Sequence, residues 1–573
     1  MTPSDSRNKG RGKGRARPGR GASPRRSPRL GALPLGGEAA WRRLFPILAA
    51  LIYAAVMLPL ALHYHAIGDH GVETDFYGGL VQESQQIAHG ELAIDRFKGP
   101  VYGLTLAAVT LPVGDSFTAA VILSVLSAAL ALFFTAKTIA RLFGRAPALL
   151  TVLGMAVNAQ FVKYSYTAST DMLFNLWMVA SAYFVLRRDE PSRRDLTIAG
   201  LFGGLAYLTR YAGAAALLWA PVAILLLLGG RFSWRRWAAG TGLFFAGALS
   251  LVVPWLVYCK IRAGSFIVND NYMNAAFGIY AAAGTNWEVF WRREADNFHS
   301  FIDVVFRDPA LFLKTIVRNL PTHAWYDIGF KGNDPGTTVK LPTAILSLMH
   351  PAMGALALPG FAAWVLSRPR RAQIAYVALG GFYLAVLLAV FYGSRFSLFL
   401  VPMYALLAAL LLLRIPWGRM GEFGELARAV VIAGVLVIVA MNTVTVIRGD
   451  IASGPTVVLR MRDELRAGRI ALEKGSILVA RKPHIAYYLG MEYRVFPDVE
   501  TVSELMQELH RMNARYLYYG PNEWLLRSRF RFLLDPSKAP RGLVPVIALD
   551  GAATNEPAVL YEVEASTPGT TRR

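Results

Sequence analysis

The chain has 573 residues, of which 54% are hydrophobic and 17% are charged. This balance is too apolar for a soluble protein of that length and predicts a protein that crosses a membrane several times. The formal net charge of +22 invites a nucleic-acid-binding interpretation, but residues 1–43 hold twelve Arg or Lys residues against two acids and supply +10 of it. The single cysteine, Cys259, excludes an internal disulfide framework and a cysteine-based metal site.

Residues 1–43 are rich in Gly, Pro, Ser and Arg and cannot bury a core, so we expect a disordered cytoplasmic tail. Its positive charge would fix the topology and is compatible with contact to anionic lipid headgroups. No small-residue cleavage site follows the first apolar run, so the tail is not expected to be a signal peptide. We expect the bilayer, and not nucleic acid, to be a partner.

Apolar runs long enough to cross about 30 Å of hydrocarbon recur through residues 44–447. The predicted spans, about eleven in number, are 44–64, 117–137, 147–165, 170–187, 196–212, 213–230, 237–258, 343–366, 372–392, 396–414 and 428–447. With the N-terminus inside, this count places every Arg-rich loop between spans in the cytoplasm, as the positive-inside rule requires. The sequence therefore predicts a multi-pass protein of the cytoplasmic (inner) membrane.

One apolar segment is ambiguous. Val101–Val113 has only 13 residues, with Pro100 before it and Pro112 near its end. If it crossed the membrane, every later basic loop would move outside, so we expect a helix in the outer interface or a re-entrant one. This places loops 65–116 and 260–341 on the outer side.

The region 448–573 differs in its hydrophobic pattern from the spans and would also lie on the outer side of the membrane. Strands are expected at 476–480, 514–519, 543–549 and 558–563, and helices at 483–489 and 502–512. Alternating strands and helices predict a small α/β domain. Acceptor binding is a candidate role for this domain, and we expect Lys482-Pro483-His484 within it to be structural.

A polar run follows the first span, and its acids are candidate catalytic residues. Asp75 lies within Glu73-Thr74-Asp75-Phe76-Tyr77. An ionisable group at a membrane face is costly, and a carboxylate there can take a proton from an acceptor hydroxyl. The alternative is that Asp75 caps a helix starting near Phe76. Glu73 is an alternative base, and Tyr77 is a secondary candidate.

Two further residues extend this candidate site. Lys98 precedes Gly99-Pro100 and the short apolar segment. An ammonium group at headgroup depth could hold a lipid phosphate. The alternative is that Lys98 is an ordinary snorkelling lysine. Asp171 begins the fourth span and could orient the acceptor or share the proton; the alternative is a cap for the helix from Met172.

Two arginines fall on the outer side, where cations are less expected. Arg210, followed by Tyr211, lies between two spans, and Arg395 precedes the tenth span. Guanidinium groups could stabilise charge on a departing phosphate; the alternative is snorkelling or pairing with a carboxylate. His323 lies among aromatic residues that could stack on a sugar or mark the interface. No metal spacing, P-loop or dinucleotide fingerprint is present, so neither a metal nor a cofactor is expected.

Together these residues resemble the GT-C membrane glycosyltransferases of family 39, which include protein O-mannosyltransferases and aminoarabinose transferases. The resemblance covers about residues 44–415. It is carried by the acid after the first span, Lys98-Gly99-Pro100, Leu142-Phe143-Gly144, Asp171, Leu208-Thr209-Arg210-Tyr211, and Ser394-Arg395-Phe396 leading to Pro402. It implies a GT-C-like, α-helical polytopic fold with interfacial helices and a small C-terminal α/β domain.

The resemblance also implies a chemistry. The donor would be a sugar linked to polyprenyl phosphate, Asp75 the catalytic base, Lys98 a contact to the lipid phosphate and Asp171 a second functional acid. Many members carry Asp-Glu where this chain has Asp75-Phe76, which leaves the acceptor open: a lipid, a glycan or a protein. One displacement without a covalent intermediate would invert the anomeric carbon.

Two other functions are alternatives for a polytopic membrane protein. A lipid or solute transporter would show two similar halves with broken helices near the bilayer midplane, whereas the polar residues here gather at one face. Another lipid-linked transferase, such as an oligosaccharide ligase or a phosphoethanolamine transferase, is the third possibility. Phosphoethanolamine transfer requires a nucleophilic Thr and metal ligands in a large soluble domain, which the sequence does not show.

Overall fold

The computed structural model describes residues 37–65, 68, 72–282, 285, 287–329, 347–390, 392–452, 456–550 and 557–564. Residues 1–36 of the expected tail lie outside the described residues. So do residues 330–346, which include the start of the expected span 343–366.

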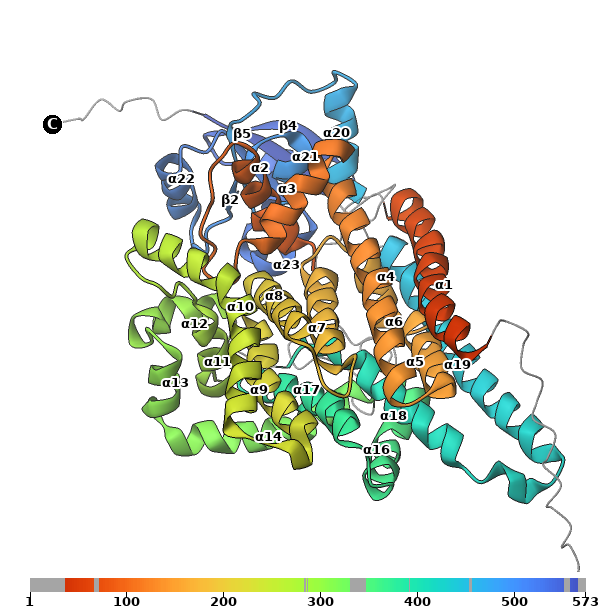
Figure 1. Ribbon diagram of the computed structural model, residues 1–573. Coiled ribbons are helices and arrows are strands. Elements are labelled where there is room, and N and C mark those ends of the chain that lie inside the picture. The colour runs from red at the N-terminus through yellow and green to blue at the C-terminus, as the bar shows by residue number, and fades with distance from the viewer. Residues whose placement is uncertain are drawn as a thin grey trace, which may run out of the picture.

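A bundle of long apolar helices forms most of the molecule (Figure 1). Among the described residues, six stretches are long and apolar enough to cross a bilayer: Ala40–Tyr64, Ser116–Leu142, Tyr211–Arg231, Trp234–Ala263, Phe396–Met420 and Phe423–Arg466, the last with residues 453–455 outside the description. They contain the helices α1 (Glu38–Pro59), α4 (Ser116–Leu142), α9 (Ala214–Leu228), α10 (Trp234–Ala263), α18 (Val401–Arg414) and α19 (Phe423–Ala452).

The remaining expected spans correspond to shorter helices. α5 (Arg145–Ala156) and α6 (Ala159–Tyr166) meet at a bend of 62° and together have the length of one span. The others are α7 (Asp171–Leu186), α8 (Arg193–Thr209), α16 (Pro351–Leu366) and α17 (Arg371–Leu387). The apolar run lengths therefore located the helices of the bundle.

Small residues bring two of these helices together. A Cβ atom at Gly200 of α8 would lie 1.9 Å from the carbonyl oxygen of Phe244 in α10. A Cβ atom at Gly247 of α10 would lie 2.1 Å from the carbonyl oxygen of Thr197. Only glycine permits this backbone approach, a common device where apolar helices pack in a membrane.

The ambiguous apolar segment is the helix α3 (Val101–Val113), which ends at Gly114 with φ of 84°. At about 1.5 Å per residue it is too short to cross the hydrocarbon core, which agrees with the predicted interfacial or re-entrant position. Further short helices complete the non-spanning segments: α2 (Val81–Ala88), α11 (Asn271–Tyr280), α12 (Trp287–Glu294), α13 (Phe301–Arg307) and α14 (Pro309–Asp327).

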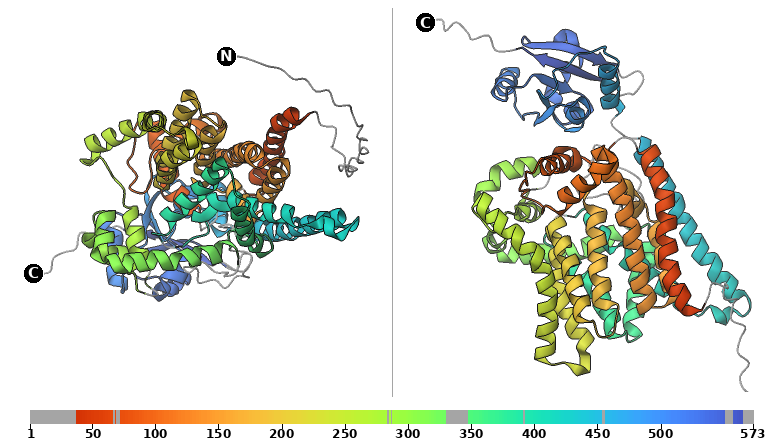
Figure 2. Two further views of the ribbon diagram at one scale, coloured as in Figure 1. Left: turned by 60° about the horizontal axis from the view of Figure 1, so that its bottom comes forward. Right: turned by 45° about the horizontal axis from the view of Figure 1, so that its top comes forward.

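The C-terminal domain lies at one end of the bundle (Figure 2, right). Its sheet has the order β2-β1-β3-β5-β4, with β2, β1 and β3 parallel and β5 antiparallel to both neighbours. The strands are β1 (Ile477–Ala480), β2 (Glu492–Val495), β3 (Tyr516–Tyr519), β4 (Leu543–Leu549) and β5 (Ala558–Val563). The helices are α20 (Thr456–Arg466), α21 (His484–Leu489), α22 (Val502–Arg511) and α23 (Pro521–Leu526).

The four expected strands and two expected helices of this domain are present. Three elements were not predicted: α20, α23 and the edge strand β2. The sequence of β2, Glu-Tyr-Arg-Val, is mostly exposed and lacks a buried face, so it gives no alternating hydrophobic signal.

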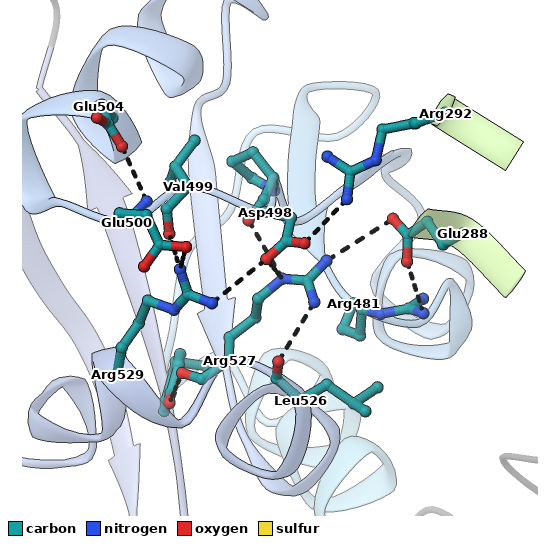
Figure 3. A network of polar contacts seen from close by, with 12 residues as sticks. Glu288, Arg292, Arg481, Asp498, Val499, Glu500, Glu504, Leu526, Arg527 and Arg529 are labelled. Carbon is teal, nitrogen blue, oxygen red and sulfur yellow. Dashed lines mark hydrogen bonds and ion pairs between the residues drawn. The ribbon is translucent and has the colours of Figure 1, made fainter. Parts of the chain in front are cut away.

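A charged network joins α12 to the C-terminal domain (Figure 3). Arg481 Nη2 donates to Glu288 Oε2 at 3.2 Å, and Arg292 Nη2 donates to Asp498 Oδ2 at 2.9 Å. The buried Arg527 lies between these two acids, 3.7 Å from Glu288 Oε1 and 3.6 Å from Asp498 Oδ1. Arg527 is 4% exposed, whereas Glu288 and Asp498 are 31% and 24% exposed, so the network links the two parts of the chain around one buried cation.

Candidate active site

Asp75 lies immediately before the π-helical turn Phe76–Leu80. Its side chain makes no cap hydrogen bond, so the helix-cap alternative is wrong. Its Oδ2 instead accepts from Arg395 Nη1 at 2.8 Å, and the side chain is 54% exposed. Partial burial raises the pKa of Asp75, but Arg395, with Lys98 and Arg210 behind it, lowers that pKa below its usual value. The carboxylate is thus ionised and open to a ligand.

Asp171 is the first residue of α7 and is almost fully buried. The cap alternative is wrong here too, because Asp171 lies inside the helix and the helix has no side-chain cap. Its Oδ2 accepts from Arg395 Nε at 2.9 Å, and its Oδ1 pairs with Arg210 Nη1. Arg395 therefore bridges Asp75 and Asp171.

The two arginines come from helix ends. Arg210 directly follows α8, and its guanidinium carbon lies 5.9 Å and 5.8 Å from the ring centres of Phe174 and Phe396. Arg395 precedes the turn that leads into α18. The carboxylate-pairing alternative is confirmed for both, since both bind Asp171. A shared carboxylate holds the two cations side by side.

Lys98 is positioned by the glycine that follows it. A Cβ atom at Gly99 would lie 2.4 Å from the carbonyl oxygen of Leu208, so only glycine lets this loop reach the end of α8, where Arg210 lies. Lys98 Nζ pairs with Asp95 Oδ2 at 2.6 Å and is mostly buried, which does not fit a snorkelling lysine. We refer to Asp75, Lys98, Asp171, Arg210 and Arg395 as the acid–cation cluster.

Glu73 has a different environment from Asp75. It is fully buried, and its Oε1 pairs with His65 Nε2 at 2.9 Å and accepts from the backbone N–H of Ala168 at 2.8 Å. These contacts tie the segment that carries Asp75 to the connection between α6 and α7. Both contacts use Oε1 of Glu73, and its role as the alternative base stays a prediction. Sequence reasoning missed His65, which has no motif around it.

The C-terminal domain contacts the same segment. Tyr77 and Tyr488 share a hydrogen bond of 2.8 Å between their hydroxyl groups, and the Tyr77 ring lies 4.5 Å from that of His484. Lys482 Nζ donates to Thr74 Oγ1 at 3.4 Å. The run Lys482-Pro483-His484, expected to be structural, therefore contacts Thr74 and Tyr77, the neighbours of Asp75 in the chain.

Two secondary candidates lie elsewhere in the contact network. Tyr211 donates to the carbonyl oxygen of Val268 at 3.3 Å. His323 packs on Tyr392 at 4.9 Å between ring centres, and burial lowers its pKa to about 4, so it is neutral near pH 7. In the described part of the chain, no hydrogen bond or ion pair joins either residue to the acid–cation cluster. Among the same residues, no group of three His, Cys, Asp or Glu side chains is arranged to hold a metal ion.

Residues 97–258 match the family model described as dolichyl-phosphate-mannose-protein mannosyltransferase. The match includes Lys98, Asp171 and Arg210 of the cluster, while Asp75 and Arg395 lie outside it. No curated protein matches the chain in sequence.

Solved structures cover much more of the chain. ArnT from Cupriavidus metallidurans bound to undecaprenyl phosphate superposes with a TM-score of 0.53 at 14% identity, covering 90% of this chain and 98% of that one. The archaeal oligosaccharyltransferase AglB from Archaeoglobus fulgidus, in complex with an inhibitory peptide and a dolichol-phosphate, gives 0.51 at 14% identity, covering 83% and 69%. The chain has the GT-C glycosyltransferase fold. The resemblance drawn from short motifs is thereby confirmed, and the family match and the fold both indicate a membrane glycosyltransferase.

Proposed function

We propose that this GT-C chain transfers a sugar from a polyprenyl-phosphate donor to an acceptor hydroxyl at the outer face of the cytoplasmic membrane. The observation that carries the proposal is the bridging of Asp75 and Asp171 by Arg395, with Lys98 and Arg210 close by. Two acids and three cations at one membrane face suit a reaction whose leaving group is a phosphate. The acceptor is a lipid, a glycan or a protein, and the sugar is a hexose, a pentose or an amino sugar.

The ends of the helices support this placement. Asp75 follows the first span, Asp171 starts α7, Arg210 follows α8 and Arg395 precedes α18. Helices that alternate in direction bring these ends to the same side of the bundle. The cluster thus lies at one end of the helices, which favours an interfacial enzyme over a transporter with a midplane site.

In the proposed reaction, Asp75 takes the proton of the acceptor hydroxyl as its oxygen attacks the anomeric carbon. The bond from that carbon to the phosphate oxygen breaks, and polyprenyl phosphate leaves with the electron pair. Attack from the face opposite the phosphate inverts the anomeric carbon. Lys98, Arg210 and Arg395 stabilise the charge that develops on the leaving phosphate, as point charge and as guanidinium donors.

The ion pair of Asp75 has a consequence for this mechanism. While Arg395 binds Asp75, the carboxylate is a weak base, because its pKa is lowered. A donor phosphate bound by Arg395 would neutralise part of that charge and raise the basicity of Asp75. Donor binding would in this way activate the base, and Asp171 would keep Arg395 in place throughout.

The test is sugar transfer by the purified protein, with synthetic polyprenyl-phosphate sugars as donors and product detection by mass spectrometry. Glycan profiling of a deletion strain first identifies the sugar. D75N is expected to lower the rate at least about 100-fold, because it keeps the shape of the side chain and removes the base. D189N is the matched control, since Asp189 is 96% exposed and lies in the connection between α7 and α8, at the ends of these helices opposite to Asp171 and Arg210. Full activity of D75N would refute the proposal.

A further inference from the structure

A cavity of about 360 Å³ lies where the C-terminal domain meets the outer ends of α1 and α4. None of the five residues of the acid–cation cluster lines it. Its lining residues are Ala61, Leu62, His65, Asp115, Phe117, Thr118, Val121, Arg462, Arg466, Tyr487 and Tyr488. The helix bundle supplies four apolar residues together with His65, Asp115 and Thr118, and α20 and α21 supply two arginines and two tyrosines.

Two arginines on one face of α20 give this cavity its charge. Arg462 and Arg466 are four residues apart, so their side chains lie on the same side of the helix. Arg462 is held by its neighbour Asp463, with a hydrogen bond of 2.9 Å, and Arg466 is exposed and has no ion pair with a described residue. Asp115, the acid at the cavity, is engaged as the cap of α4 and accepts the backbone N–H of Thr118 at 2.7 Å.

The cavity stands at the border between apolar and polar surface. Ala61 and Leu62 close the first apolar stretch, and Phe117 and Val121 open the second. In a bilayer these helix ends lie near headgroup level, where an amphiphile keeps its charge in the polar layer and its chains in the hydrocarbon. Planar guanidinium groups bind phosphate oxygens with paired hydrogen bonds.

We propose that this cavity binds the phosphate-bearing head of an anionic membrane amphiphile, at a site separate from the acid–cation cluster. Two residues that line this cavity also contact the segment that carries Asp75. His65 lines the cavity and pairs with Glu73, and Tyr488 lines it and bonds Tyr77. An occupant therefore contacts the residues that position Asp75.

The test measures lipid retention by the full-length protein in detergent, using native mass spectrometry with added phosphatidylglycerol, phosphatidylcholine or inorganic phosphate. Phosphatidylglycerol is expected to bind in preference to zwitterionic phosphatidylcholine. R466Q is expected to weaken that binding about tenfold, and R462Q/R466Q to weaken it further, because charge-assisted hydrogen bonds are lost. Since Arg466 is exposed and has no partner among the described residues, R466Q should fold normally, which a thermal melt checks.

R469Q is the matched control, because Arg469 is an exposed arginine near α20 that pairs with Glu464 and does not line the cavity. K98Q, in the cluster, is expected to retain phosphatidylglycerol. Equal retention in R462Q/R466Q and R469Q would overturn the site, and so would loss in K98Q alone. Competition by inorganic phosphate as effective as that by phosphatidylglycerol would overturn the lipid assignment. None of these readouts depends on glycosyl transfer, so they stand apart from the test of D75N.

Discussion

Arg395 Nη1 lies 2.8 Å from Asp75 Oδ2, although the two residues are 320 positions apart in the chain. The same guanidinium binds Asp171 through its Nε. The pKa of the candidate base is thus set by a cation from a distant loop, and a ligand that binds this cation changes that pKa. Four expectations follow from this arrangement and from its surroundings.

The first concerns the pH dependence of activity. Arg395 holds the pKa of Asp75 below its usual value, so the active carboxylate form persists into acid. In R395Q the pKa of Asp75 rises, so the loss of activity on acidification begins at a pH about one unit higher. The maximal rate also falls, because a cation that stabilises the leaving phosphate is removed. The measurement is kcat/KM from about pH 3 to 8, since the usual pKa of an aspartate is about 3.9. R428Q, in the predicted cytoplasmic loop, is the control, and an unchanged acid limb in R395Q would contradict the assignment.

The second concerns Glu83, a buried acid on α2 that packs against Gly103 and has no hydrogen-bond partner for its Oε1 among the described residues. Burial raises the pKa of Glu83 to about 7, with Lys98 opposing and Asp95 adding to the shift. Between its usual pKa and pH 7 the folded state binds more protons than the unfolded state. Stability is therefore expected to fall as pH rises through this range.

E83Q removes the titrating group. Because each unit of pKa shift corresponds to about 1.4 kcal/mol, E83Q is expected to raise the melting temperature by a few degrees at pH 8 and to change it little at pH 5. The exposed Glu91 gives the control E91Q, with no pH-dependent effect. Equal shifts of E83Q at both pH values would show that Glu83 is not the titrating group.

The third concerns the network between α12 and the C-terminal domain. Arg527 is 4% exposed and lies between Glu288 and Asp498. R527Q removes the buried guanidinium from Glu288 and Asp498, which are 31% and 24% exposed, so it is expected to destabilise the protein by about 1–2 kcal/mol. Limited proteolysis and thermal unfolding would report this change. R511Q, an exposed arginine paired with Glu508 within α22, should behave as the wild type; if R527Q does so too, the network does not hold the domain.

The fourth concerns topology. The helix ends place the acid–cation cluster and the C-terminal domain on one side of the bundle, which we expect to be the outer side. A reporter enzyme active only outside the cytoplasm, fused after Gly468, should therefore be active. The same reporter fused after Gly230, in an Arg-rich loop, should be inactive. Reversed signals would mean that the orientation or the number of spans is wrong.

The sequence by itself determined the helices and most of the candidate residues. Apolar run length and loop charge are fixed by the thickness of the bilayer and by its positive inner face, so they located the helices, including the short Val101–Val113. Lys98-Gly99-Pro100 was visible as a motif, and the close contact of Gly99 with Leu208 explains its glycine.

The tertiary structure alone decided the partners. Arg395 pairs with both Asp75 and Asp171. Glu73 pairs with His65 and accepts the backbone N–H of Ala168. Tyr488 of the C-terminal domain forms a hydrogen bond with Tyr77. Periodicity reports only which face of a helix or strand is buried and which near neighbours share it. Contacts between residues hundreds of positions apart depend on how whole helices and domains pack, and no local pattern encodes them.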